Sequence, residues 1–269
     1  MLAFAGNSLL CRVALRDTAI DPGSFTALRI LAGALTLWLL VRVRRQGVSA
    51  SGTGNWASAL ALFVYAAAFS YAYVDLPTGT GALLLFGAVQ ATMIGVGLWR
   101  GERLDTTQTT GLVLAGAGLV GLLLPGLSAP PLPGAALMLG SGVAWGIYSL
   151  RGKGAGDPTR VSAGNFIRAT LPAAALALAT VPLARLDAAG AGYAIASGAL
   201  TSGMGYAIWY AALHHLRATT ASTVQLSVPV LAAIGGTVFL AEPLTARLVL
   251  ASVAVLGGIA LVLLRRPAR

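Results

Sequence analysis

The chain has 269 residues, of which 57% are hydrophobic and only 10% are charged. A soluble domain carries about 25% charged residues, and its surface-to-volume ratio would leave too much of this apolar surface in water. The net charge of +10 does not indicate nucleic-acid binding, because the basic residues form short clusters between apolar segments rather than a stripe. The single cysteine, Cys11, excludes a disulfide within the chain and a Cys-based metal site. The composition therefore predicts an integral membrane protein.

Successive apolar segments approach the length of about 20 residues that crosses the hydrocarbon core of a bilayer. Because backbone polar groups in lipid must be satisfied within the segment, and the alternating pattern of a membrane β-strand is missing, we expect α-helices. The predicted spans, in chain order, are residues 1–15, 24–41, 56–74, 79–99, 109–125, 134–150, 161–182, 192–213, 219–240 and 245–264. The sequence thus predicts an all-α membrane protein of about ten transmembrane helices.

The first predicted span is short, with about 15 residues. Either this helix is thinned at its inner end, or the natural chain starts upstream of Met1, and we favour the second interpretation. No basic region or cleavage site precedes the span, so we expect no removable signal peptide.

Basic residues collect in alternate loops. They follow the second, fourth, sixth and eighth spans and end the chain, whereas the opposite loops hold mainly Arg16, Arg185 and Arg247. The positive-inside rule therefore predicts a multi-pass protein of the inner (plasma) membrane with both termini in the cytoplasm.

The two halves of the sequence repeat each other. A shift of 140 residues takes Glu102 to Glu242, and a shift of 139 takes Arg29 to Arg168. Apolar helices rich in Ala, Gly and Leu have similar sequences by composition alone. The matched Arg and Glu positions make composition alone a less adequate explanation of the repeat. We therefore predict one five-helix repeat over residues 1–125 and a second over 134–266. Because five is odd, the second repeat would be inverted, with a substrate site near the membrane midplane between the halves.

These features resemble the drug/metabolite transporter superfamily, in particular its ten-helix EamA-type branch. The resemblance rests on the Arg29 and Arg168 helices, on residues 220–230, and on Trp-Arg-Gly-Glu-Arg-Leu at 99–104, which returns as Phe-Leu-Ala-Glu-Pro-Leu at 239–244. It implies a pseudosymmetric bundle whose central cavity is lined by the first, third, fourth, sixth, eighth and ninth helices. It also implies export or exchange of amino acids, related metabolites or drugs.

Polar and aromatic residues inside the spans are the candidates for lining a cavity. An aromatic wall with a few amide and hydroxyl groups suits small uncharged or zwitterionic ligands. The candidates are Asn7, Tyr71, Thr80, Gln90, Trp145, Tyr148, Tyr206, Trp209 and Gln225. For the Trp and Tyr residues an interfacial aromatic belt is the alternative, and we assign Trp56, Tyr73, Trp99 and Tyr210 to that belt because they lie near span ends.

The arginines inside the spans have two interpretations. Arg29 and Arg168 each lie about two turns into a helix, where an ionisable residue is costly and often functional. In a functional role, each would help to gate one face or attract a substrate carboxylate. In a structural role, each would bond carbonyl groups at helix ends or extend to the interface, and we favour the structural role. Arg12 is expected to pair with Asp17 or Asp21, with gating as the alternative.

Three further residues have predicted structural roles. Glu102 and Glu242 lie at helix junctions, where each is expected to accept N–H groups that open the following helix. Pro229 lies within the ninth span and is expected to bend it beside Gln225.

The distribution of titratable residues argues against proton coupling through a carboxylate, because no Asp or Glu lies in the middle of a span. His214 and His215 could titrate near neutral pH, but interfacial solvation is the favoured role.

No nucleophile elbow, HExxH motif or acidic pair is present, so we expect no enzyme, no metal and no cofactor. The predicted function is secondary transport of a small molecule by alternating access, and a channel or structural scaffold is the alternative. The GxxxG motif from Gly142 to Gly146 permits close helix packing. It leaves open whether the protein is a monomer or a homodimer.

Overall fold

The computed structural model describes the chain except for residues 44–52, 127–128, 153–154, 214–223 and 265–269. The described residues form helices and connecting loops without strands. The helices are α1 (Leu2–Asp17), α2 (Pro22–Val43), α3 (Trp56–Ala72), α4 (Thr78–Trp99), α5 (Thr106–Leu123), α6 (Leu132–Gly152), α7 (Pro158–Ala179), η1 (Val181–Leu183), α8 (Ala188–Ala196), η2 (Ser197–Met204), α9 (Gly205–Leu213), α11 (Ser227–Leu240) and α12 (Ala246–Leu264).

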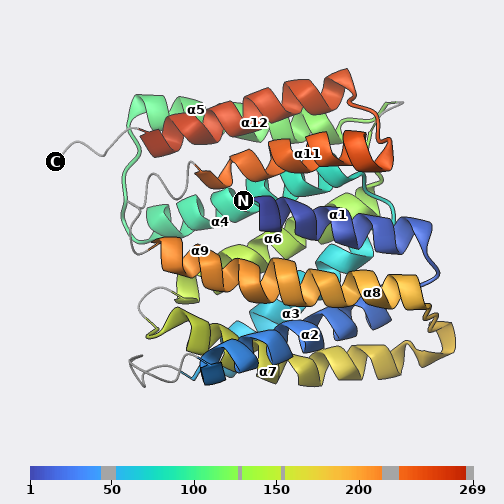
Figure 1. The fold of residues 1–269 in the computed structure, drawn as a ribbon. Coiled ribbons are helices and arrows are strands. Elements are labelled where there is room, and N and C mark those ends of the chain that lie inside the picture. The colour runs from blue at the N-terminus through green and yellow to red at the C-terminus, as the bar shows by residue number, and fades with distance from the viewer. Residues whose placement is uncertain (44–52, 127–128, 153–154, 214–223, 265–269) are drawn as a thin grey trace.

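These helices lie roughly parallel or antiparallel in one bundle (Figure 1). Of those described, α2, α4, α5, α7 and α12 are each long and apolar enough to cross a membrane, and α3 and α11 are shorter apolar helices. The elements α8, η2 and α9 follow one another without a break and together form the predicted eighth span. An all-α membrane protein with about ten helices is therefore confirmed.

Side-chain caps explain where several helices begin. Asn55 accepts the N–H of Ser58 at the start of α3, and Asp157 accepts that of Arg160 at the start of α7. Asp105 and Gln108 form a reciprocal capping box at the start of α5. Such caps satisfy N–H groups that have no partner within the helix.

The central part of the eighth span is a π-helix, which the sequence did not lead us to expect. Segment η2 contains Gly198, at which an added Cβ would overlap the backbone carbonyl oxygen of Arg29 on α2. Glycine therefore allows α2 and η2 to approach at backbone distance. π-Helical turns occur frequently at functional sites, and this turn faces α1 and α2 at the centre of the bundle.

Two helix pairs form opposite edges of the bundle, α5 with α12 and α2 with α7 (Figure 1). In the first pair Gly111 and Gly258 face each other so closely that a Cβ on either would overlap or crowd the other's carbonyl oxygen. Inside the bundle, Gly142 and Gly146 face α4, where an added Cβ would meet Leu85 and Thr92 respectively. Packing within the chain thus accounts for the GxxxG motif.

The contacts also follow the exchange of halves that the predicted sequence repeat would give, and the counterparts named below are those of that predicted repeat. Helix α6 packs on α3 and α4, and its counterpart α1 packs on α8, η2 and α11. Helix α3 contacts α7, and its counterpart in the second half, α8 with η2, contacts α2. The pairs α2–α7 and α5–α12 are their own counterparts under this exchange.

Candidate functional site

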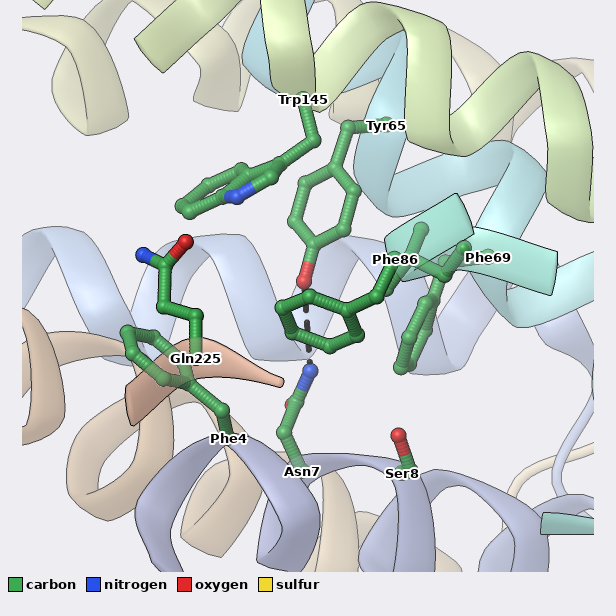
Figure 2. A pocket seen from close by; sticks show the side chains of 9 residues that line it. Phe4, Asn7, Ser8, Tyr65, Phe69, Phe86, Trp145 and Gln225 are labelled. Carbon is green, nitrogen blue, oxygen red and sulfur yellow. Dashed lines mark hydrogen bonds between the residues drawn. The ribbon is translucent and has the colours of Figure 1, made fainter. Parts of the chain in front are cut away.

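A cavity lies where α1, α3, α4 and α6 meet the helical residues just before α11. Its empty volume is about 360 Å³, a figure that includes space open to the surroundings. Its lining residues are Phe4, Asn7, Ser8, Tyr65, Phe69, Leu85, Phe86, Trp145 and Gln225 (Figure 2). Aromatic rings form most of the wall, with amide and hydroxyl groups between them, which is the composition typical of a small-molecule site.

The polar side of the cavity is a hydrogen-bonded network between four helices. The Asn7 amide Nδ2 donates to the Tyr65 hydroxyl at 3.3 Å, the contact marked in Figure 2. The Asn7 carbonyl oxygen accepts from Ser197 at 2.7 Å and from Thr201 at 3.2 Å, both on η2. Arg29 on α2 donates from Nη2 to the same Tyr65 hydroxyl at 2.8 Å. The network fixes Asn7 and Tyr65, because each contact is buried where water cannot replace it.

The aromatic side of the cavity is built around Trp145. Its ring lies 4.8 Å from that of Tyr65 and 5.2 Å from that of Tyr206, and it stacks on Tyr148 at 5.3 Å. Phe4 lies 5.9 Å from Tyr206. Aromatic pairs at these separations are attractive beyond their buried area, so Trp145 is held in place by rings from α3, α6 and α9.

The structure divides the candidate cavity residues into three groups. Asn7, Trp145 and Gln225 line the cavity. Three others form a second layer in contact with a lining ring: Tyr148, Tyr206 and Trp209, the last packing edge-on against Phe4 at 6.1 Å.

The rest lie elsewhere. Tyr71 faces Gly23 at the start of α2, and Gln90 and Thr80 are buried in α4 but do not line the cavity. For Tyr71, Gln90 and Thr80 the sequence identified polar groups inside a span without identifying the face on which they lie.

Several lining residues were missed by the sequence analysis, above all Tyr65 and Phe69. Both lie on the buried face of α3, one turn apart. The sequence did contain a signal for Tyr65, because this tyrosine lies at the centre of a predicted span and far from both membrane interfaces. We had instead assigned Tyr73 to the interfacial belt, but it is fully buried and donates its hydroxyl to the carbonyl of Thr78.

The two matched arginines differ in their surroundings. Arg29 is only 2% exposed and donates to the Tyr65 hydroxyl, so its described contacts are not the carbonyl groups or the interface that we expected for a structural arginine. Arg168 does fit that role, because its Nη1 donates to the carbonyl oxygens of Thr53 at 2.7 Å and Gly164 at 3.0 Å.

Arg12 and Glu242 form a contact that the sequence did not predict. Arg12 Nε lies 3.2 Å from Glu242 Oε1, so the expected pairing with Asp17 or Asp21 is wrong. Arg12 also donates to the carbonyl oxygens of Tyr73 at 2.9 Å and Val74 at 2.6 Å. These contacts join the end of α1 to the loop after α3 and to the loop after α11.

The expected caps at the two helix junctions need correction. Glu242 Oε2 accepts the N–H of Thr78 at 2.7 Å, so it caps α4 in the other half of the chain rather than the following helix. Helix α5 is capped by Asp105, and Glu102 is exposed beside Gly97.

Pro229 lies in the first turn of α11, which begins at Ser227, rather than in the middle of a continuous helix. A proline there sacrifices no helical hydrogen bond. The helix is instead interrupted by a turn at Leu226, directly after Gln225. His214, His215 and the side chain of Tyr210 lie outside the described residues.

Comparison with known proteins identifies the class. The model of the EamA-like transporter family matches residues 132–264. An uncharacterized protein of Pseudomonas aeruginosa is 62% identical over 100% of this chain and 93% of its own. An uncharacterized transporter of Archaeoglobus fulgidus is 30% identical over 72% of this chain and 70% of its own. The threonine/homoserine exporter RhtA of Escherichia coli K12 is 35% identical over 161 residues, and the chain covers 51% of that exporter's length.

A solved crystal structure shares the fold, with a TM-score of 0.68 at 21% identity over 99% of this chain and 98% of the other. The family match covers the second half of the chain, and the relatives extend the similarity across the first. The chain belongs to the EamA-like transporter family, within the drug/metabolite transporter superfamily.

Proposed function

We propose that the protein is a secondary transporter of amino acids or related small amphipathic metabolites, which it exports or exchanges by alternating access. The observation that carries the proposal is the cavity itself, a small aromatic and amide-lined space where helices of both sequence halves meet. Similarity to threonine/homoserine exporters supports the substrate class and the outward direction.

Alternating access requires two arrangements of the bundle around one site. The exchange of contacts between α1 and α6, and between α3 and α8 with η2, supports two inverted repeats over residues 1–125 and 134–266. Two such repeats can trade conformations, and each trade would open the opposite end of the cavity.

The Arg12–Glu242 contact is the proposed gate at one end of the cavity. It lies at the end of α1 that faces the first residue of α4, and both partners are largely buried, with 12% and 9% of their side chains exposed. Arg16, one turn after Arg12, adds a hydrogen bond to the carbonyl of Leu240 at 3.0 Å. The positive-inside rule places both termini in the cytoplasm if the protein lies in the inner membrane. In that orientation the Arg12–Glu242 gate closes the outer side of the cavity.

Counterflow in proteoliposomes tests the transport proposal. Vesicles are loaded with one unlabelled compound from a panel of amino acids and small amphipathic drugs, and uptake of the same labelled compound is followed. We expect transient accumulation of at least one compound. Failure of the whole panel with folded protein, together with a voltage-dependent current in planar bilayers, would instead support a channel.

Substitutions in the cavity locate the site. Trp145→Ala and Gln225→Ala are expected to reduce counterflow about tenfold or more without loss of membrane insertion, because each removes a lining side chain. Trp99→Ala is the matched control, since that ring is 87% exposed at the end of α4. Unchanged transport by both cavity variants would remove these residues from the site.

A further inference from the structure

Arg29 is a buried cation without an anionic partner. All eight carboxylate side chains of the sequence belong to the described part of the chain, and the ion pairs found there, Arg12–Glu242 and Arg16–Asp17, do not include Arg29. Its Nη1 is buried and has no hydrogen-bond partner among the described residues. An unpaired charge deep in a membrane protein is costly and is retained where it serves a function.

The charge of Arg29 lies directly behind the cavity wall. Its guanidinium carbon is 5.3 Å from the centre of the Tyr65 ring and 4.8 Å from that of the Phe69 ring. Both rings line the cavity. Contact with the faces of two rings offsets part of the cost of burying the cation. The positive charge therefore lies against two rings of the cavity wall and against the Tyr65 hydroxyl.

The Tyr65 hydroxyl presents a free hydrogen to the same cavity. Its oxygen accepts from Arg29 Nη2 at 2.8 Å and from Asn7 Nδ2 at 3.3 Å, which uses its acceptor capacity. The Asn7 carbonyl oxygen accepts from Ser197 at 2.7 Å, and in this orientation its Nδ2 is the group that faces Tyr65. No acceptor for the Tyr65 hydrogen lies within hydrogen-bonding distance in the described ranges.

The buried charge of Arg29 and the hydrogen of the Tyr65 hydroxyl reinforce each other. A hydroxyl that accepts from a guanidinium is polarised and becomes a stronger donor, as expected for chains of hydrogen bonds in a low-dielectric interior. Figure 2 shows the Tyr65 oxygen reaching across the cavity towards Asn7, between the rings of Phe86, Phe69 and Trp145. The wall therefore combines a positive potential, one aimed donor and apolar surfaces around them.

We infer that this cavity recognises a carboxylate, with the Tyr65 hydroxyl as the direct donor and Arg29 as the buried counter-charge. The substrate class is a small carboxylic or amino acid whose apolar part packs against Trp145 and Phe4. This assignment rests on the proposed transport function and makes it more specific, because the anionic group, rather than apolar character alone, then selects the substrate. A bound carboxylate would also supply the negative charge that Arg29 lacks.

Benzoate and benzamide are the probes for this inference, because they are nearly equal in size and differ mainly in charge. Their binding to purified full-length protein is measured by isothermal titration calorimetry at constant ionic strength. We expect benzoate to bind at least about tenfold more tightly than benzamide, the difference that corresponds to one hydrogen bond to a charged group. Equal binding of the two compounds, or no binding of benzoate, would overturn the inference.

Variants assign the preference to the named residues. Tyr65→Phe keeps the ring and removes the donor, so benzoate affinity should fall about tenfold while benzamide affinity changes little. Arg29→Gln should remove the preference for benzoate. Tyr193→Phe is the control, because Tyr193 lies on α8 and does not line the cavity. If benzoate binds Tyr65→Phe as tightly as the wild-type chain, the inference fails, even where Arg29→Gln does not fold.

The binding measurement is independent of transport. Preference for benzoate without counterflow of any compound would contradict the transport proposal and support the carboxylate site. Counterflow of a compound together with equal binding of benzoate and benzamide would support the transporter and contradict the carboxylate site.

Discussion

Helices α2 and α7 occupy matching positions in the two halves of the sequence and lie side by side at one edge of the bundle. Each begins at the proline of an Asp-Pro pair, and each carries an arginine about two to three turns later. Yet Arg29 on α2 points into the bundle and contacts the cavity wall, whereas Arg168 on α7 bonds carbonyl groups near its own helix. A sequence repeat thus conserves the position of a charge without conserving its role.

The neighbours of the two helices explain the difference. Segment η2 packs against α2 through Gly198 and provides Ser197 and Thr201, which bond to Asn7, one of the two partners of Tyr65. At the matched site on α7, the carbonyl oxygen of Thr53 lies within reach of Arg168 and satisfies it. In the proposed carboxylate site, the charge of Arg29 would act on the ligand and that of Arg168 would not.

The largest expected effect separates the two arginines directly. Arg29→Gln should lower counterflow of a transported carboxylate about tenfold or more, because it removes the counter-charge of the site. Arg168→Gln should change the same rate less than about twofold, since it loses only hydrogen bonds to carbonyl groups at the edge of the bundle. Initial rates at equal amounts of reconstituted protein measure the difference, and equal losses would show that the two helices are functionally equivalent.

The close approach of η2 to α2 provides the next test. Gly198→Ala places a methyl group against the Arg29 carbonyl and should destabilise the protein by about 1–3 kcal/mol through overpacking. Gly192→Ala, in the same continuous helical segment, meets no atom within 4 Å and should leave stability unchanged or slightly increased. Thermal unfolding in detergent, followed by tryptophan fluorescence, compares the variants. A stable Gly198→Ala variant would show that α2 and η2 can separate at little cost.

The smallest expected effect concerns the starts of the two helices. Burial acts to raise the pKa of Asp21, but hydrogen bonds from Ser24, Arg185 and Gly23 outweigh it and place the pKa below its ordinary value. A lowered pKa contributes stability that is present above the unfolded-state pKa of about 3.9 and is lost as the pH falls through the folded-state pKa. Asn keeps the capping oxygen and removes only the charge, so Asp21→Asn should cost about 0.3–1 kcal/mol at pH 7 and reduce the acid sensitivity of the unfolding midpoint.

Asp157→Asn is the matched substitution at α7. Asp157 accepts from Arg160 N at 2.7 Å at the start of its own helix, whereas Asp21 is also bonded to the distant Arg185. We expect the smaller loss at α7. A larger loss of stability in Asp157→Asn than in Asp21→Asn would show that the additional hydrogen bond between Asp21 and Arg185 does not hold the start of α2 more tightly than the start of α7 is held.

The sequence predicted only part of the cavity lining, and the lining residues that it did identify share one feature. Asn7, Trp145 and Gln225 were identified because polar or bulky groups near the middle of apolar spans need a partner or a space. Tyr65 was missed because its importance depends on donors from α1 and α2, which lie 58 and 36 residues away. Glu242 was correctly placed at a helix junction, but the helix that it caps is distant in sequence.

Composition and the spacing of apolar segments determined that this chain is a helical membrane protein of about ten spans, because lipid leaves the backbone few alternatives. Repeated motifs also led to its family before any contact was known. Tertiary structure alone decided which arginine lies against the cavity wall, where the eighth span widens into a π-helix, and which carboxylate meets Arg12. The reason is physical: helix periodicity fixes the face on which a side chain lies, but only packing determines what that face meets.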